Sequence, residues 1–357
     1  MALAQVPALS VESVPDGPLV LERLGSILSQ RLGGQGDAEP VAFFSGNING
    51  ILKLRYQGRY LGVRIALNTY RFRYEKDIIK EIFALFLIYF ARDAENDDVA
   101  RDIVDGVLAS PVGSHVGHAL VHRVIHYDWS MATLPWPFFI YEWVDGEILW
   151  ADPDPARYCT AGRNLARLHR ITFQSYYRDI FRIGREPLSW HQRFAAALVV
   201  ERTQALPRLS PTVAARLEAL DPASLSPARP CLVHNDYSGG NIIVDSGGGQ
   251  KVIDWDNWLV DAPELDLMKM KYWTAIGADG LLAPDHRLYS AFLQGYNGVA
   301  GAVLDRRRFE AYELLWLTRA HNFESAHRSD REQTAGGSTL ARHYPPASAY
   351  ETYLSDL

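Results

Sequence analysis

Two short apolar runs separated by a glycine-rich turn constrain this chain more than any other feature. The runs are Ile242–Val244 and Val252–Ile253, and the turn between them is Asp245-Ser-Gly-Gly-Gly-Gln250. Apolar runs on either side of such a turn predict a β-hairpin. Asn241 precedes the first run and Asp254 follows the second. The predicted hairpin therefore brings an amide and a carboxylate close together.

A third polar residue, Asp236, lies five positions before Asn241 and is preceded by the apolar pair Leu232-Val233. Transfer of a nucleotide γ-phosphoryl group needs one carboxylate to orient and deprotonate the attacking hydroxyl. It also needs an Asn and a second Asp to hold Mg²⁺ against the phosphates. The order Asp236, Asn241, Asp254 supplies these three groups, so the segment predicts a phosphotransferase centre.

The bulk composition is that of a globular protein and gives no sign of a polyanion as a partner. The chain has 357 residues, of which 48% are apolar and 22% are charged, and its net charge is −6. A negative net charge offers no electrostatic footprint for nucleic acid, so nucleic acid is not an expected partner. Cys159 and Cys231 lie 72 positions apart without metal-ligand spacing, and we interpret both as reduced thiols.

No segment predicts export or membrane insertion. The first 17 residues lack the positively charged start of a secretory signal. Residues 82–90 are uniformly apolar, but this run is nine residues long, whereas a bilayer-spanning helix needs about 20. We therefore expect a cytoplasmic protein without a membrane partner.

The first part of the chain predicts an antiparallel sheet with helices. Helical apolar spacing covers residues 18–32 and ends at a Gly-Gly pair, and residues 74–91 form a second helix free of Gly and Pro. The short runs that read as strands are 41–45, 51–56, 60–67, 121–127 and 138–144. Together they predict a five-stranded sheet.

Beyond residues 145–146 (Asp-Gly) the pattern becomes helical. The predicted helices cover residues 155–170, 190–206, 211–220, 287–296 and 305–328. The chain should therefore form an α+β fold with two lobes. Residues 1–144 make up an N-terminal lobe with the sheet, and residues 145–357 make up a mainly helical C-terminal lobe that contains the hairpin.

The catalytic segment resembles a known superfamily. His234-Asn-Asp236, followed by Asn241-Ile-Ile-Val and Val252-Ile-Asp254-Trp-Asp256, is similar to the aminoglycoside phosphotransferase and choline/ethanolamine kinase superfamily, relatives of the protein kinases. The resemblance implies a bilobed protein-kinase-like fold. It also implies that Asp236 is the catalytic base, that Asn241 and Asp254 bind Mg²⁺, and that Asp256 is a second acid near the acceptor.

The resemblance also implies where the nucleotide binds. The turn between the first two strands, with Ser45, Gly46, Asn47 and Asn49, stands where relatives carry the loop that covers the phosphates. A turn of this composition is equally common in plain hairpins. Tyr141-Glu-Trp-Val-Asp-Gly146 resembles the hinge between the lobes, where backbone atoms around Glu142 and Val144 bind the base. Backbone contacts leave the choice between ATP and GTP open.

Arg64 and Glu81 match the family's strand cation and helix acid, which orient the α and β phosphates. Protein kinases have Lys in the strand, whereas this chain has Arg, as in the choline kinase branch; the two cations differ in geometry. Glu75 is a rival partner for Arg64, and an exposed ion pair is the alternative interpretation.

The acceptor is the least constrained part of the prediction. Acidic residues near Asp256 and in the C-terminal helices (Glu310, Glu313, Glu324) favour an amine-bearing alcohol, such as an amino sugar or aminocyclitol in antibiotic resistance or biosynthesis. Tyr237 and Trp258 lie beside the predicted site and are candidates for cation–π stacking on that substrate. Two alternatives remain: an uncharged sugar or nucleoside acceptor, and a catalytically silent regulator that binds the nucleotide.

Overall fold

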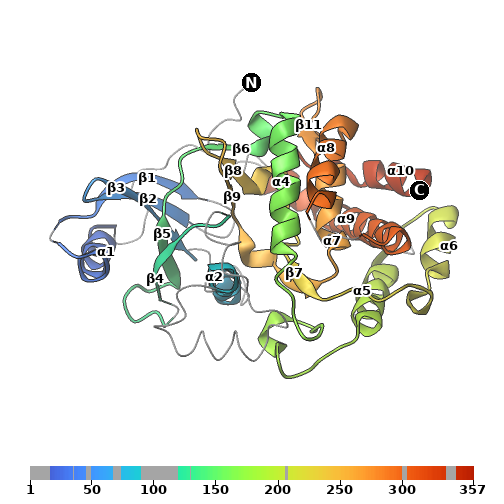
Figure 1. Cartoon of the computed structure of the whole chain (residues 1–357), viewed down its shortest axis with the longest axis horizontal. Helices are drawn as coiled ribbons and strands as arrows, with labels where there is room; N and C mark the ends of the chain where they lie inside the picture. The colour runs from blue at the N-terminus through green and yellow to red at the C-terminus, as the bar shows by residue number, and fades with distance from the viewer. Residues whose placement is uncertain are drawn as a thin grey trace.

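A computed structural model describes most of the chain. The described residues are 17–34, 36–45, 50–66, 74–89, 120–128, 130–205, 208–299, 304–334 and 343–357. Figure 1 shows a strand-rich end, which carries the N-terminal segments, and a helical end, which carries the C-terminal ones.

The strand-rich end contains one five-stranded antiparallel sheet. Its strands are β1 (Glu39–Ser45), β2 (Gly50–Tyr56), β3 (Arg59–Ile65), β4 (Val124–Asp128) and β5 (Phe138–Glu142), and their order in the sheet is β1-β2-β3-β5-β4. Strands β1, β2 and β3 pair in succession, and β5 pairs with both β3 and β4. The predicted five-stranded antiparallel sheet is confirmed.

The two faces of this sheet have different partners. Helix α1 (Gly17–Leu32) packs on one face, where Leu24 and Leu28 join Leu52, Val63 and other buried strand residues in one apolar cluster. Side chains alternate between faces along a strand. Arg64 therefore points to the opposite face, on which the residues of β5 belong to the cluster shared with the helical end.

Helix α2 (Tyr74–Tyr89) connects the sheet to the helical end. Its residues Ile78, Ile82 and Leu85 are buried in the large apolar cluster that includes most of the C-terminal half. The Lys80 carbonyl accepts a hydrogen bond from the indole of Trp258 at 2.6 Å. The helix therefore touches the segment that follows the predicted metal ligands.

Small strands frame the catalytic segment. They are β6 (Glu147–Ile148), β7 (Cys231–Val233), β8 (Ile242–Val244), β9 (Gln250–Val252), β10 (Leu259–Asp261), β11 (Ala275–Ile276) and β12 (Leu282–Ala283). β8 and β9 form the predicted hairpin, and β6 pairs with the outer side of β8. β7 pairs with β10, so the chain enters the catalytic loop and leaves it on adjacent strands.

Helices build the rest of the C-terminal half. They are α4 (Pro155–Leu168), α5 (Trp190–Ala205), α6 (Pro211–Ala219), α7 (Glu264–Tyr272), α8 (His286–Asn297), α9 (Arg306–Thr334) and α10 (Ala347–Asp356). In Figure 1, α4 and α8 run side by side in front of α7 and α9. Among the described residues, no helix is long and apolar enough to cross a membrane.

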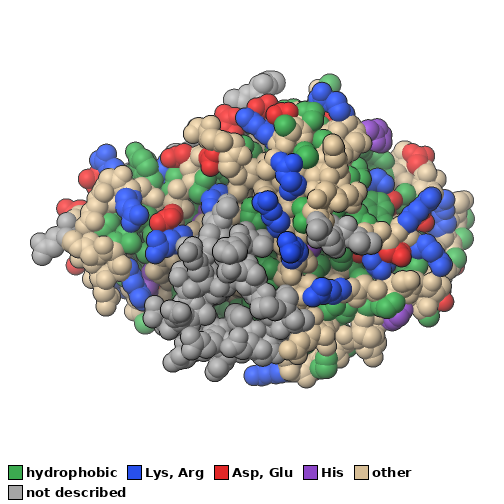
Figure 2. Space-filling view, in the orientation of Figure 1, with side chains coloured by type: hydrophobic (Ala, Val, Ile, Leu, Met, Phe, Trp, Pro, Cys, Tyr) green, Lys and Arg blue, Asp and Glu red, His purple; other side chains and the backbone are tan. Residues whose placement is uncertain are grey.

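In helix α4 the sequence pattern determines where the helix begins and which face is buried. Asp154 caps its first turn by accepting a hydrogen bond from the Ala156 amide, and a proline follows at the first helical position. Ala161, Leu165 and Leu168 are buried, whereas Arg163 and Arg167 are exposed. Figure 2 shows a row of Lys and Arg side chains over this helix.

The predicted elements agree closely with the observed ones, with a few differences. The third strand ends at Ile65 rather than at residue 67, which lies outside the described residues, and the fifth ends at Glu142. Helices α7 and α10 were not predicted from apolar spacing. The division into lobes at residues 144/145 stays a prediction.

Candidate active site

The catalytic loop after β7 is held by one buried carboxylate. The backbone amides of His234 and Asn235 donate hydrogen bonds to Asp266 at 2.7 and 2.6 Å, and His169 lies 3.2 Å from the same carboxylate. Asn235 adopts a left-handed conformation (φ 61°), which Asn tolerates better than most residues. Anchored on both sides, the loop presents Asp236 in a fixed position.

The β8–β9 hairpin brings the two predicted metal ligands together. The Ile253 amide donates to the Asn241 carbonyl at 3.0 Å, directly before Asp254. The Asn241 side-chain amide donates to the Asp236 carbonyl at 2.9 Å, which leaves the Asn241 side-chain oxygen as the atom able to bind a cation. An amide oxygen and a carboxylate are hard oxygen donors of the kind that Mg²⁺ prefers. The residues present fit a magnesium ion.

Asp254 itself has a strained backbone. Its φ of 65° and ψ of 60° lie in the left-handed region, and the residue stands immediately before the short helical turn Trp255–Asn257. Strain of this kind persists where the surrounding structure dictates it, and it is concentrated at functional sites. The conformation turns the chain sharply at the end of the hairpin.

Arg64 is the centre of a buried cluster of charged side chains that includes Asp254, one of the predicted metal ligands. Arg64 of β3 contacts Glu81 of α2 at 2.8 Å, Asp254 at 2.8 Å and Asp256 at 3.6 Å. Burial disfavours the charged form of Arg64, but the three carboxylates outweigh it and raise the guanidinium pKa above its usual value. The structure therefore brings Arg64 and Glu81 together, as the sequence predicts. The side chain of the rival Glu75 lies outside the described residues.

The carboxylates of this cluster differ in their protonation. Burial raises the pKa of Glu81 to about 7, and burial with the charge of Asp254 raises the pKa of Asp256 to about 8. For Asp254, burial acts in the same direction, but Arg64 outweighs it and lowers the pKa. The carboxylate charge is thus concentrated on Asp254, the residue that the sequence assigns to the metal.

Sequence reasoning missed Lys269 of α7. Its ammonium group forms an ion pair with the Asp236 carboxylate, and both side chains are about four-fifths buried. It also lies 4.8 Å from the centre of the Trp273 ring. A signal was present, since Lys269 follows Asp266 by three residues and would share its face on a helix. The helix itself was not predicted.

A pocket of about 340 Å³ opens next to Asp236. Aromatic side chains from α9, α10, the residue directly after α7 and the segment before α10 form much of its wall: Trp316, Phe323, Tyr350, Trp273 and Tyr344. The Trp273 indole donates to the Tyr350 hydroxyl at 3.0 Å, which fixes α10 against α7. Asp236, the predicted base, is one of the residues that line the pocket.

The charged residues of the pocket are balanced rather than acidic. Asp236 and Glu324 line it together with Lys269 and Arg319. The predicted acidic wall is therefore only partly assembled. Glu310 is exposed and pairs with Arg306, whereas Glu313 is buried and pairs with Lys271, away from the pocket.

Two of the predicted substrate contacts are corrected by the structure. Tyr237 is 1% exposed, and its hydroxyl donates to the Ala161 carbonyl at 2.8 Å. Trp258 is fully buried, with its indole bound to Lys80 of α2. Both rings therefore pack the core behind the site and present no face to a substrate. Asp256, the third predicted substrate contact, is buried beside Arg64.

The predicted nucleotide contacts are described only in part. Glu142 ends β5, and the Trp143 amide donates to the Tyr60 carbonyl of β3 at 3.1 Å, so the hinge segment is tied to the sheet before Val144. The role of Glu142 and Val144 stays a prediction. In the covering loop, Gly46, Asn47 and Asn49 lie outside the described residues. Ser45 ends β1, and its side chain lies outside them as well.

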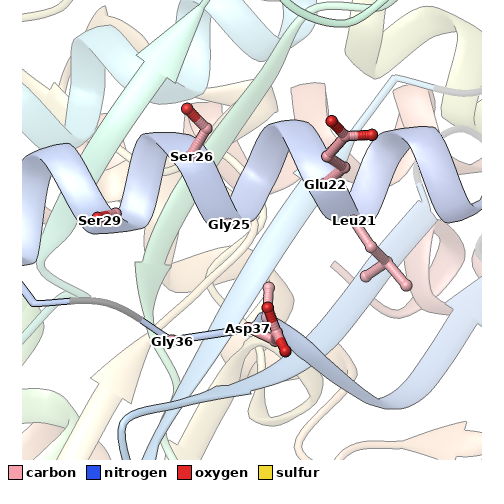
Figure 3. Close-up of a pocket in the computed structure, with 8 residues that line it drawn as sticks. Leu21, Glu22, Gly25, Ser26, Ser29, Gly36 and Asp37 are labelled. Atoms are coloured by element: carbon pink, nitrogen blue, oxygen red, sulfur yellow. The ribbon is translucent and has the colours of Figure 1, made fainter.

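A second cavity lies on the far side of the sheet from the site. Its volume is about 450 Å³, and its lining includes Leu21, Glu22 and Ser26 of α1 together with Asp37. Figure 3 shows that it runs between α1 and the extended segment that carries Gly36 and Asp37. None of the predicted catalytic residues lines it.

The phosphotransferase enzyme family matches residues 113–309, which is more than half of the chain and includes Asp236, Asn241 and Asp254. None of the curated proteins compared with this chain matches it significantly.

Three solved structures have similar folds. A spectinomycin phosphotransferase in complex with ADP and spectinomycin is 13% identical (TM-score 0.54), and the match covers 94% of this chain and 98% of that one. A Ralstonia eutropha protein assigned as an aminoglycoside phosphotransferase is 16% identical, with the same score and coverage. An aminoglycoside phosphotransferase with AMP-PNP and hygromycin B is 14% identical (TM-score 0.51), covering 92% and 98%. The predicted bilobed fold is therefore confirmed.

Proposed function

The chain belongs to the phosphotransferase enzyme family, and we propose that it transfers the γ-phosphoryl group of ATP or GTP to a hydroxyl of a small molecule. The observation that carries this proposal is the assembly of Asp236, Asn241 and Asp254 around one hairpin, next to a pocket. Phosphoryl transfer needs a carboxylate base and oxygen ligands for Mg²⁺, and these three side chains can supply them.

Each residue then has a role in the transfer. Asp236 orients the acceptor hydroxyl and accepts its proton. Arg64, held by Glu81, binds phosphate oxygens of the nucleotide, and the backbone around Glu142 and Val144 binds its base. Asn241 and Asp254 hold Mg²⁺, which neutralises charge on the phosphates when bound.

For the acceptor, we propose an amine-bearing alcohol such as an amino sugar or aminocyclitol. Glu324 supplies a carboxylate in the pocket, and the aromatic walls suit both a sugar ring and a cation. The related folds with spectinomycin and hygromycin B accept molecules of this class, which supports the proposal.

One observation favours a second acceptor class, the uncharged sugars and nucleosides. Lys269 and Arg319 line the same pocket and repel an ammonium group. Arg319 is paired with Glu201 at 2.9 Å and Lys269 is paired with Asp236, so the pocket as a whole is near neutral. An acceptor without charge would meet no opposing field there.

A panel assay distinguishes these possibilities. Amino sugars, aminocyclitols, choline-like amines, neutral sugars and nucleosides are each incubated with the enzyme, Mg²⁺ and either ATP or GTP, and acceptor-dependent release of the nucleoside diphosphate is measured. Turnover with the amines supports the first class, and turnover with neutral compounds supports the second. Nucleotide binding without any turnover would favour the silent regulator.

Replacement of the base tests the mechanism. We expect Asp236→Asn to lower kcat by about two to four orders of magnitude, because the hydroxyl loses its proton acceptor. Nucleotide binding should be retained, since Asp236 faces the pocket rather than the sheet. Asp245→Asn, in the turn of the β8–β9 hairpin, is the matched control and should leave kcat unchanged. Near-normal turnover by Asp236→Asn would rule out the assigned base.

A further inference from the structure

Lys269 lies in the candidate active site but has none of the roles assigned to the base, the metal ligands and Arg64. Its ammonium group contacts the Asp236 carboxylate through Oδ1 inside the acceptor pocket. The ammonium group therefore lies next to the place where the acceptor hydroxyl would bind to Asp236. A substrate that enters the pocket must either contact Lys269 or displace it from Asp236.

The side chain is held in this place by its own helix. Lys269 lies on α7, whose Asp266 anchors the catalytic loop three residues earlier. On the other side, the ammonium group rests 4.8 Å from the centre of the Trp273 ring. Anchors before and after Lys269 limit its motion, which is how preorganised charges are arranged in active sites.

Lys269 also lies close to the metal side of the site. The Asp236 carbonyl oxygen accepts a hydrogen bond from the side-chain amide of Asn241, a proposed metal ligand, at 2.9 Å. The ammonium group therefore contacts a base whose backbone is bound directly to the proposed magnesium site.

We propose that Lys269 is a further catalytic residue, which contacts an equatorial oxygen of the phosphoryl group during its transfer. The proposal rests on the proposed function. Charge spreads over the equatorial oxygens in a loose phosphoryl transition state, and a fixed cation stabilises it. In the resting enzyme, the Asp236 carboxylate takes the place of that phosphoryl oxygen as the partner of Lys269.

In the proposed transfer, the acceptor oxygen forms a bond to the γ-phosphorus. The hydroxyl proton passes to Asp236, at the carboxylate oxygen that Lys269 does not contact. The bond from the γ-phosphorus to the bridging oxygen breaks, and its electron pair stays on the nucleoside diphosphate. Lys269 keeps its proton and its place throughout, and one of its three N–H groups contacts the phosphoryl group.

The test needs no knowledge of the acceptor. Aluminium fluoride with Mg·ADP mimics a phosphoryl group in transfer, so its affinity is compared with that of Mg·ADP alone by calorimetry. The variants are Lys269→Met, which removes the charge, and Lys269→Gln, a second neutral replacement in case the first does not fold. Lys271→Met is the control, because Lys271 lies on the same helix but pairs with the buried Glu313.

We expect both Lys269 variants to bind Mg·ADP normally and to lose roughly a hundredfold in affinity for the aluminium fluoride complex. Lys271→Met should lower thermal stability and leave both affinities unchanged. If Lys269→Met and Lys269→Gln weaken both ligands equally, or neither, Lys269 is structural and the inference is wrong. The same comparison is made with Mg·GDP, and failure of the wild-type protein to bind either nucleotide would overturn the proposed function and this inference together.

Discussion

At the scale of single residues, the environment of His122 shows what burial does to an ionisable group. The imidazole is 8% exposed, and its ring lies 4.6 Å from that of Tyr141. Its Nδ1 has no hydrogen-bond partner among the described residues. Burial, helped by the charges of Lys251 and Arg64, lowers the pKa of His122 to about 3.

This pKa predicts acid-sensitive stability. In the unfolded chain the imidazole has its ordinary pKa of 6.5, whereas in the folded chain its pKa is about 3. Between these two pH values, only the unfolded chain binds the proton. The contribution of neutral His122 is therefore fully present above pH 6.5 and is lost as the pH falls towards 3, by up to about 1.4 kcal/mol per pH unit. We expect the free energy of unfolding, measured with urea at pH 7, 6 and 5, to fall less steeply with decreasing pH in His122→Gln than in the wild type. Equal slopes would contradict the assignment.

At the scale of elements, two glycines let α4 and α8 cross in close contact. A Cβ at Gly162 would lie 1.9 Å from the Phe292 carbonyl oxygen, and one at Gly295 would lie 1.8 Å from the Cys159 carbonyl oxygen. Both obstacles are backbone atoms, which have little room to move. The contact matters for the site because α4 is followed directly by His169, a partner of Asp266.

The crossing predicts that Gly162→Ala and Gly295→Ala each destabilise the protein by about 2–3 kcal/mol, because the helices must separate. Gly25→Ala in α1 is the matched control. Its Cβ would meet the nearest atom, the Ala38 amide nitrogen, at 3.7 Å, so stability should be unchanged or higher by about 0.5–1 kcal/mol. Chemical denaturation measures all three. An α4 or α8 variant as stable as Gly25→Ala would refute the tight crossing.

Local patterns made the catalytic elements predictable from the sequence. The hairpin carries Asn241 and Asp254 within 14 residues, and turn chemistry alone decides how its strands pair. The contact of Gly162 with Phe292 joins residues 130 positions apart, so periodicity contains no trace of it. Lys269 escaped prediction because α7 is buried on most sides and lacks an apolar stripe.

Burial explains the errors among the aromatic residues. Tyr237 and Trp258 lie beside the predicted catalytic residues in the sequence, and proximity favoured a substrate role. Whether a ring faces solvent depends on helices from elsewhere in the chain, such as α2, whose Lys80 carbonyl binds Trp258. The pocket next to Asp236 likewise combines α7, α9 and α10, with Trp273 and Tyr350 separated by 77 positions.

At the scale of the whole molecule, Arg64 ties the sheet to the helical half. It reaches from β3 to Glu81 of α2 and to Asp254 and Asp256 after the hairpin. Arg64, Glu81 and Asp256 are each less than a tenth exposed. A single cation therefore compensates several carboxylates at the junction, and removing it leaves buried negative charge without a partner.

We expect Arg64→Met to destabilise the protein by about 3–5 kcal/mol, the usual cost of removing one partner from a buried ion pair. Arg55→Met is the matched control on the same sheet. Arg55 and its partner Glu39 are both more than half exposed, and surface pairs contribute little. Urea denaturation of both variants and the wild type measures the difference.

Magnesium then separates an electrostatic role of Arg64 from simple packing. In Arg64→Met the Asp254 carboxylate loses its guanidinium partner. Mg²⁺ can then bind to Asp254 without competition from Arg64. We expect Mg²⁺ to raise the unfolding midpoint more in Arg64→Met than in the wild type, because binding to the folded state alone stabilises it. Asn241→Ala in the Arg64→Met background should abolish the extra shift, since it removes the second proposed ligand. A shift of equal size in the wild type, Arg64→Met and the double variant would mean that Asp254 and Asn241 do not form the magnesium site.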